Sequence, residues 1–530
     1  MNRLLLSTWL IALTLFSCTP QNPHDHLQRL RLNIRSDPVT LDPRRSKDVT
    51  SSAVIRLCFD GLMRRNEKGE CSFSIAKDVQ ISDDGLTYTF YLQKALWSDG
   101  MPVTAKNFEH AWKSMLDPSF TSELSYELFI LKNGKKANEG HVSLHNIGVK
   151  ALSDDVLQIQ LEHPTPYFLD LLTTSSFYPI PSHIVDKHPD WTKNGGRQYV
   201  CNGPFLVHEW KHYSHITLSK NPHYWDKEAV KLAQIDMYMI ENETTELSMY
   251  YNGEIDWAGN PLSSLPEDAL SSLTKNPDFH QYDISGIYYY IFNTKAFPFT
   301  NKHIRRAFAL AIHRQEIIDN LLHGQQHVAA ALVPSTMWTR EMNYFADADL
   351  VQAKIELEQG LAELGITRKD LPEIKLSYNT SHSHHKMAQA IKDQWSKALH
   401  IHVHLENMEW KVFLDTVRTH HFQIARMGGV ASFNDPMTFL GIYRLGNSQM
   451  NQSQWSHPTF TTLLDQADLE QDPSRRLTLL AQAEQIFMDE MPLAPIYFYS
   501  GSYLQKPHLK GVKLSQLSDI DLKYAYMDKP

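Results

Sequence analysis

Cysteine is scarce in this chain, with only four among 530 residues, and long apolar runs are scarcer still. After the first twenty residues no apolar run approaches the ~18 residues of a membrane-spanning helix, which argues against a polytopic membrane protein. Basic charge is also in deficit: 51 Lys+Arg against 60 Asp+Glu give a net charge of −9. Such a balance makes nucleic acid a poor partner. Aromatic residues are abundant, with 23 Tyr, 23 Phe and 11 Trp. The composition predicts a packed globular protein with the rigid contact area that binding sites use.

The N-terminus has the pattern of a bacterial export signal. Within residues 1–17 a positive charge precedes an apolar stretch, residues 4–16, that is short for a membrane span. The run that ends at Cys18 resembles the lipobox of bacterial lipoproteins, which predicts that Cys18 is lipidated; an ordinary signal peptide with an incidental cysteine is the alternative. Residues 18–27 are polar and suit a tether. We therefore expect a protein of the periplasm or cell envelope, anchored to a membrane through lipid.

Hydrophobic periodicity predicts that strands dominate the first half of the chain and helices the second. Strands are expected near residues 30–34, 86–92, 156–161, 203–219, 374–378 and 401–405. Helices are expected at 104–115, 301–323, 350–364, 384–398, 409–420 and 473–490. This alternation predicts α/β domains with partly parallel sheets.

One stretch matches a catalytic metal motif. His208 to His212 fits the HExxH pattern, which binds zinc only on a helix. The surrounding pattern predicts a strand, on which histidines four residues apart lie about 13 Å apart, too far for one zinc ion. The chain has no Gly-x-Ser-x-Gly elbow, no glycine-rich phosphate loop and no Cys-x-x-Cys pair. We expect neither an enzyme nor a bound cofactor.

Ten short blocks match one known family in order along nearly the whole mature chain. They are LDP (41–43), FDGL (59–62), YTFYL (88–92), WSDGMPVTA (97–105), DP (117–118), NGPF (202–205), KNPHYWD (220–226), GEID (253–256), FNTK (292–295) and EWK (409–411). In these blocks the chain resembles the bacterial extracellular solute-binding proteins of ABC importers, in the peptide/nickel class (family 5). It is most similar to the periplasmic oligopeptide-binding proteins.

The resemblance implies an α/β fold of two lobes, the clamp-like class II of periplasmic binding proteins, with an extra inserted domain. Two strands would cross between the lobes as a hinge, near Ser285-Gly286 and Ser500-Gly501. The implied division of the chain is domain I at 28–59, 184–285 and 501–530, domain II at 60–183, and domain III at 286–500.

The resemblance also implies a function without catalysis. Such a protein, expected to be a monomer, captures a peptide between its lobes and delivers it to the permease subunits of an ABC transporter in the inner membrane. Because it accepts many sequences, we expect it to recognise the peptide backbone through strand-like pairing.

Eight positions match the family's ligand site. Arg426 would pair with the peptide carboxylate, His384 would lie near the same end, and Gly428 would allow close approach of the backbone. Cleft-wall positions are matched by Asn260, Tyr289, Trp410 and Tyr499, and the eighth position is Ser432. For the aromatic residues and the arginine, a purely structural role is the alternative.

Ser432 departs from the family pattern. It stands just before the block Phe433–Pro436, where the family commonly has an aspartate that binds the peptide's α-ammonium. A buried ammonium without its counter-ion loses on the order of 3 kcal/mol, about a hundredfold in affinity. Asp435 or Glu409 are candidates to compensate. Otherwise we expect a short, blocked or γ-linked peptide, such as glutathione or a murein fragment.

Two other roles stay open. The wider family includes receptors for nickel, metal complexes and haem, and histidines cluster at 382–385 and at 420–421. A sensor or adhesin built on the same fold is the other alternative, because signalling and import use the same clamp.

Overall fold

The computed structural model describes residues 28–46, 48–66, 70–122, 124–193, 195–323, 326–448 and 450–528. The predicted signal peptide (1–17), Cys18 and the tether (18–27) lie outside these residues. No helix in the described ranges is both long enough and apolar enough to cross a membrane.

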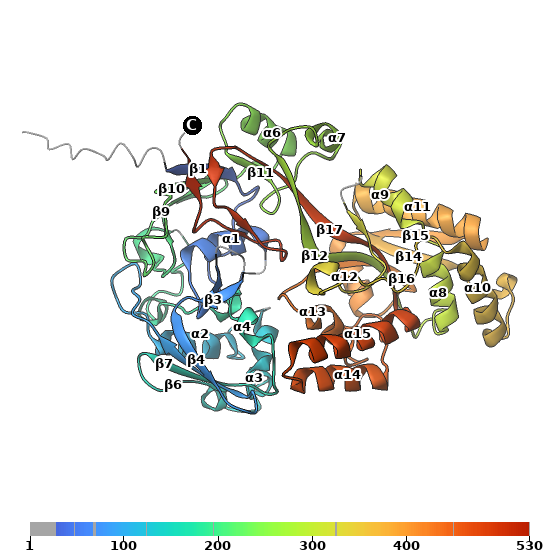
Figure 1. Cartoon of the computed structure of the whole chain (residues 1–530), viewed down its shortest axis with the longest axis horizontal. Helices are drawn as coiled ribbons and strands as arrows, with labels where there is room; N and C mark the ends of the chain where they lie inside the picture. The colour runs from blue at the N-terminus through green and yellow to red at the C-terminus, as the bar shows by residue number, and fades with distance from the viewer. Residues whose placement is uncertain are drawn as a thin grey trace, which may run out of the picture.

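The chain folds into two lobes joined by two long strands (Figure 1). The first lobe contains the chain before β12 (Phe279–Phe292) and after β17 (Leu493–Gln505), and the second lobe contains the chain between these two strands. Their buried cores are separate: one large core uses residues between 30 and 262 and between 509 and 525, and the other uses residues between 287 and 497.

One sheet of mixed direction runs through both lobes. In the described chain it has eleven strands, with β13 (His327–Val328) pairing only with β17. The order of the others is β15 (Val403–Met408), β14 (Ile374–Asn379), β16 (Ile424–Val430), β12 (Phe279–Phe292), β17 (Leu493–Gln505), β11 (Trp257–Gly259), β1 (Arg29–Asn33), β10 (Gln234–Tyr238), β9 (His215–Lys220) and β8 (Phe205–Lys211). Strand β1 is parallel to β10 and β11, and β14 is parallel to β15 and β16. The predicted α/β class is therefore confirmed.

Smaller sheets complete the first lobe. A four-stranded antiparallel sheet is formed by β4 (Ala76–Ile81), β5 (Thr87–Leu92), β7 (Val156–Gln160) and β6 (Val149–Ala151). The strand pairs are β2 (Met63–Arg65) with β3 (Cys71–Phe73), β18 (Leu509–Lys510) with β21 (Tyr526–Met527), and β19 (Lys513–Leu514) with β20 (Ile520–Asp521).

The longer helices lie mainly in the second lobe. The first lobe has α1 (Val49–Cys58), α2 (Ala105–Met115), α3 (Gly134–Asn138), α4 (Phe168–Leu171), α5 (Ser182–Val185), α6 (Glu243–Tyr251) and α7 (Leu270–Leu273). The second lobe has α8 (Lys302–Leu310), α9 (Arg314–Leu321), α10 (Leu350–Leu364), α11 (His382–Leu399), α12 (Trp410–Arg418), α13 (Met437–Leu440), α14 (Pro458–Leu469) and α15 (Pro473–Glu490).

The single helix predicted at 301–323 is wrong, because the chain breaks there into α8 and α9. His313 caps the start of α9 by accepting the Glu316 N–H on its Nδ1 (3.3 Å). The fully buried Arg314 donates to the carbonyl oxygens of Ala309 (2.9 Å) and Ile312 (3.0 Å), at the end of α8. These bonds satisfy the helix-end carbonyls and stop the helix.

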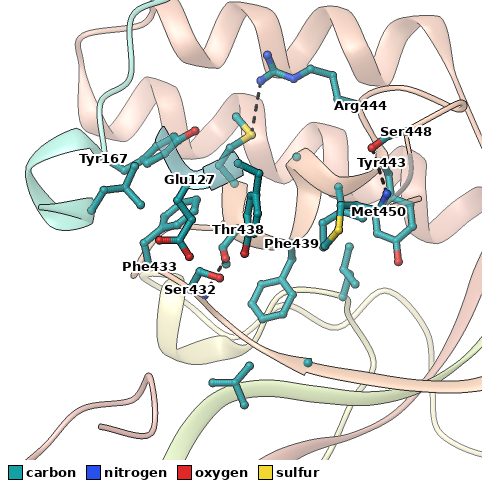
Figure 2. A pocket seen from close by; sticks show the side chains of 18 of the residues that line it. Glu127, Tyr167, Ser432, Phe433, Thr438, Phe439, Tyr443, Arg444, Ser448 and Met450 are labelled. Atoms are coloured by element: carbon teal, nitrogen blue, oxygen red, sulfur yellow. Dashed lines mark hydrogen bonds between the residues drawn. The ribbon is translucent and has the colours of Figure 1, made fainter. Parts of the chain in front are cut away.

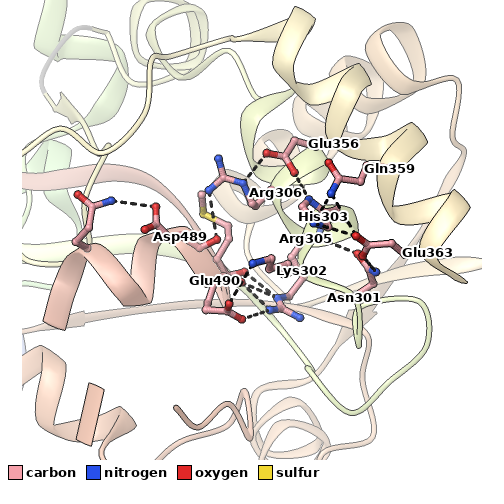
Figure 3. A network of polar contacts seen from close by, with 12 residues as sticks. Asn301, Lys302, His303, Arg305, Arg306, Glu356, Gln359, Glu363, Asp489 and Glu490 are labelled. Atoms are coloured by element: carbon pink, nitrogen blue, oxygen red, sulfur yellow. Dashed lines mark hydrogen bonds and ion pairs between the residues drawn. The ribbon is translucent and has the colours of Figure 1, made fainter. Parts of the chain in front are cut away.

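A polar network ties three helices of the second lobe together (Figure 3). Glu356 on α10 binds His303 (2.6 Å) and Arg306 (2.7 Å), both on α8. The buried Arg305 donates to the backbone carbonyl of Glu490 (2.7 Å), at the end of α15. The network holds α8 between α10 and α15 and so fixes the scaffold behind β12 and β17.

The two crossing strands are irregular where the hinge was expected. Strands β12 and β17 pair antiparallel on both sides of a register shift between Asp283 and Ile287, which spans Ser285-Gly286. A Cβ on Gly286 would lie 2.5 Å from the Tyr499 ring, and one on Gly501 would lie 2.4 Å from the Tyr282 ring. Both positions therefore require glycine because aromatic rings approach the backbone closely.

Candidate functional site

A cavity of about 590 Å³ lies between the two lobes (Figure 2). Its first-lobe wall comes from the short helix η2 (Ser125–Ile130) and from the segment 163–174 around α4. Its second-lobe wall comes from β16 and from residues 432–452, with Tyr289 of β12. The volume falls in the range of about 300–1,000 Å³ of sites that enclose small ligands.

The lobes contact each other beside this cavity. Tyr167 of the first lobe stacks on Phe433 of the second lobe, with ring centroids 4.4 Å apart. The backbone N–H of Asn434 donates to the carboxylate of Asp170 (2.9 Å), which also forms an ion pair with Arg65 (2.8 Å). The cavity is thus closed along one side by direct contact between the lobes.

Strand β16 presents an unpaired edge at the cavity. One of its edges pairs with β12 over its full length. The other edge pairs with β14 only at Ile424 and Ala425, and no strand of the described chain continues that pairing along residues 426–430. Residues 427–430 line the cavity. Free N–H and C=O groups on such an edge can pair with an extended chain.

Three of the predicted site residues line the cavity: Tyr289, Gly428 and Ser432. Burial raises the pKa of Tyr289 to about 12, so its hydroxyl stays neutral and is hydrogen-bonded to Tyr443. Ser432 is exposed, and its backbone N–H donates to Oγ1 of Thr438 (3.1 Å). The serine hydroxyl faces space that a ligand can enter.

Arg426 and His384 gather around Tyr288. Tyr288 precedes Tyr289 on β12, so the two side chains point to opposite faces of the sheet. The Arg426 guanidinium lies over the Tyr288 ring (4.7 Å), and Nδ1 of His384 lies 3.4 Å from the Tyr288 hydroxyl. Burial, and to a lesser degree Arg426, lower the pKa of His384 to about 4, so the imidazole is neutral near pH 7.

Arg426 carries an uncompensated charge. In the described part of the chain it forms no ion pair, and its buried Nε–H has no hydrogen-bond partner. Unsatisfied buried donors are rare in folded proteins, and a guanidinium of this kind suits a carboxylate. Arg426 is not among the residues that line the cavity, and its role in ligand binding stays a prediction.

Tyr499 belongs to the same aromatic cluster. Its ring packs edge-on against Tyr497 (5.7 Å), which stacks on Tyr288 (4.9 Å). The Tyr499 hydroxyl lies over Gly428, where an added Cβ would approach it to 2.3 Å. Gly428 therefore makes room for Tyr499 as well as exposing backbone to the cavity.

Asn260 and Trp410 lie away from the cavity. Asn260 donates its N–H to the carbonyl of Ser502 (3.0 Å) and accepts the Ser502 N–H on its Oδ1 (3.1 Å), so it holds β17 in place. Trp410 begins α12 with 49% of its surface exposed, and its ring packs on Phe413. Their roles in ligand binding stay predictions.

The two acids that were candidates to replace the missing aspartate already have structural partners. Asp435 forms a bidentate buried ion pair with Arg476 (2.6 and 2.9 Å). Glu409 caps α12 by accepting the N–H groups of Lys411 (2.8 Å) and Val412 (3.4 Å). Neither is among the residues that line the cavity.

Sequence reasoning missed two charged residues of the cavity wall, Glu127 and Arg444. Arg444 forms ion pairs with Asp468 (2.6 Å) and Asp465 (3.3 Å). Glu127 lies in η2, outside every matched block, and the one signal for it was an acid beside the buried apolar residues Leu128 and Ile130.

The alternative of a metal receptor is not supported by the arrangement of the possible ligand side chains in the described ranges. No group of three His, Cys, Asp or Glu side chains in the described ranges is placed to hold a metal ion. The HExxH stretch begins on β8, as the prediction that it lies on a strand requires. His212 instead contacts Asp37 (2.8 Å), and His385 contacts the Tyr378 hydroxyl (2.6 Å).

Known proteins match this chain over most of its length. Residues 72–451 match the model of the bacterial extracellular solute-binding proteins, family 5 Middle. The oligopeptide-binding protein OppA of Bacillus subtilis is 44% identical over 502 residues, which are 94% of this chain and 92% of that protein.

Solved structures agree with this match. The Escherichia coli murein tripeptide binding protein MppA superposes with a TM-score of 0.78 at 29% identity, covering 95% of this chain and 99% of that one. Haemophilus influenzae OppA, in complex with RPPGFSPFR, superposes with a TM-score of 0.76 at 27% identity, with the same coverage. The chain therefore belongs to family 5 of the bacterial extracellular solute-binding proteins.

Proposed function

We propose that this protein is the extracytoplasmic peptide-binding component of an ABC importer, which captures a peptide between its lobes and passes it to a permease. The unpaired edge of β16 along the cavity carries this proposal. An extended peptide adds to such an edge through backbone hydrogen bonds that do not depend on its side chains.

The two ends of this edge differ in chemistry. Arg426 lies at one end, and Ser432 lies six residues further along, roughly 20 Å away at about 3.3 Å per residue. A peptide with its carboxylate toward Arg426 and its N-terminus toward Ser432 would run along the whole edge. Its length would then be about five or six residues.

The relatives support a peptide as the ligand class. Their names describe binding of oligopeptides, dipeptides and murein peptides, and one solved relative is in complex with a nonapeptide. Because Ser432 lacks the charge of the family's usual aspartate, sequence alone favours short, blocked or γ-linked peptides.

The remaining parts of the proposal concern the envelope. We propose lipidation at Cys18, attachment of the mature monomer to a membrane, and delivery to inner-membrane permease subunits. We also propose the domain boundaries expected from the sequence. The separate cores on either side of residues 286 and 500 support the limits of domain III, whereas one core contains residues of both domain I and domain II.

Calorimetry on the mature chain tests the central proposal. Peptides of two to six alanines are titrated, and small-angle scattering follows the shape of the protein. We expect micromolar or tighter binding of at least one length, together with compaction. Failure of every length to bind at millimolar concentration would overturn the proposal.

A further inference from the structure

Glu127 is an acid in the cavity wall without a cationic partner. It is the one Asp or Glu among the described residues that line the cavity. In the described chain no Lys, Arg or His lies within ion-pair distance of its carboxylate, whose hydrogen-bond partners are Ser176 and Tyr126. Burial raises the pKa of Glu127 above its ordinary value, as expected for a poorly solvated carboxylate that no cation compensates.

The cations of the cavity are not available to compensate Glu127. Arg444 already forms ion pairs with Asp468 and Asp465. His163 is exposed, and its Nδ1 lies 3.2 Å from the carbonyl oxygen of Pro164. The cavity therefore has one unpaired negative charge, and a ligand that brings a positive charge gains more there than it would in water.

Glu127 faces the end of the cavity where the N-terminus of a peptide is expected. The segment that carries Ser432 touches the first lobe directly, because Phe433 stacks on Tyr167 and the Asn434 N–H binds Asp170. In Figure 2 the Glu127 carboxylate points in the direction of Ser432. An acid supplied by the first lobe thus lines the same cavity as the position where the second lobe lacks one.

We propose that Glu127 binds the α-ammonium group of the captured peptide and takes the place of the acid that Ser432 lacks. The inference rests on the proposed function and deepens it. It replaces the expectation of a blocked N-terminus with recognition of a free one. A primary ammonium offers three donors, and Glu127 and the Ser432 hydroxyl together supply acceptors from both lobes.

This arrangement links recognition to closure. The peptide backbone would add to β16 of the second lobe, while its ammonium would bind the first lobe. A ligand shifts an equilibrium only by its differential affinity for the two states. A peptide with a free N-terminus would therefore stabilise the closed form more than an acetylated peptide, whose contacts lie in one lobe.

The test compares four proteins with two ligands by calorimetry. The proteins are wild type, Glu127→Gln, the matched control Glu139→Gln, and the double variant Glu127→Gln with Ser432→Asp. Glu139 suits the control because it is an exposed first-lobe glutamate paired with Lys135 and His141. The ligands are penta-alanine with a free N-terminus and the same peptide with an acetylated N-terminus. If penta-alanine does not bind, both ligands are made at the alanine-peptide length that binds most tightly.

Wild type and Glu139→Gln should bind the free peptide about 30- to 100-fold more tightly than the acetylated one. Glu127→Gln should bind both forms within about threefold of each other, with its affinity for the acetylated peptide unchanged. That unchanged affinity shows that the variant is folded. The double variant should regain the preference, because its acid stands where the family usually has one.

Each alternative outcome has one meaning. If Glu127→Gln keeps the wild-type preference, or if wild type does not distinguish the two peptides, the role of Glu127 is wrong while peptide binding stands. If neither peptide form binds to any of the four proteins at any length, the proposed function itself fails, and the role of Glu127 falls with it. Scattering gives a second readout: the free peptide should compact wild type more than Glu127→Gln.

Discussion

Tyr167 and Phe433 stack face to face across the boundary between the lobes, with centroids 4.4 Å apart and ring planes 8° apart. Tyr167 comes from the edge of α4, and Phe433 directly follows Ser432. Both residues line the cavity, so the contact that joins the lobes is also part of the wall that a ligand meets. The same two rings therefore join the lobes and form part of the cavity wall.

Phe433→Ala should weaken closure and peptide binding together. Stacked aromatic pairs contribute about 0.5–1.5 kcal/mol beyond the area that they bury, so we expect roughly a tenfold loss of affinity. Calorimetry would measure the affinity, and small-angle scattering would show a more open ligand-free protein. The control is Phe73→Ala, which truncates a 43% exposed phenylalanine on β3. An unchanged shape and affinity in Phe433→Ala would show that the stack does not contribute to closure.

Asp435→Asn should cost stability without changing ligand preference. Breaking a buried ion pair leaves Arg476 uncompensated, which typically costs about 3–5 kcal/mol. Urea unfolding would measure that loss. Asp415→Asn is the matched control, because its partner Arg418 is mostly exposed and such pairs are worth about 0–1 kcal/mol. A stable Asp435→Asn variant that binds peptides weakly would instead give Asp435 the role of the ammonium counter-ion.

Elements with local signals could be predicted from the sequence. The helix expected at 473–490 is α15 at the same residues, because Asp472 caps it and Pro473 begins it. The split of 301–323 into two helices depends on Arg314, whose guanidinium bonds both to the end of α8 and to the carbonyl of Pro495 on β17. Because this bond joins residues 314 and 495, the hydrophobic pattern around residue 314 does not indicate that the helix breaks there.

The residues of the cavity also divide into those that the sequence could indicate and those that depend on contacts between distant parts of the chain. Three of the residues expected from the family resemblance, Tyr289, Gly428 and Ser432, line the cavity because all three lie on or beside the paired strands β12 and β16. Their roles in ligand binding stay predictions. Glu127 was missed because its proposed role depends on the arrangement of the two lobes, which places residues 127 and 432 in the wall of one cavity. Single-sequence reasoning sees an acid in a short apolar stretch and has no reason to select it.

Glu484 should make stability fall as pH rises from about 4.5 to 7. The carboxyl group accepts the N–H groups of Leu332 (3.0 Å) and Val333 (2.7 Å), and burial raises its pKa from 4.5 to about 7. In that window the folded state holds a proton that the unfolded state has released, so raising pH favours unfolding. The loss is on the order of 3 kcal/mol, complete above pH 7. Glu484→Gln keeps an acceptor oxygen and should remove this decline, as urea unfolding at several pH values would show.

His384 should make stability rise with pH, opposite to Glu484, over nearly the same pH range. Burial, assisted by Arg426, lowers its pKa to about 4, below the ordinary value of 6.5. Between these values the unfolded state binds a proton that the folded state does not, so stability rises with pH and is lost as pH falls toward 4.

The effects of Glu484 and His384 on the pH dependence of stability therefore partly cancel in wild type. A variant that lacks one of the two groups should show the effect of the other. Glu484→Gln should expose a rise in stability between pH 4 and 6.5, and His384→Gln should expose a fall between pH 4.5 and 7. Urea unfolding across this range measures both slopes, and the His384 pKa can be followed directly from its imidazole resonances. Equal slopes in the two variants would show that neither group titrates as its burial implies.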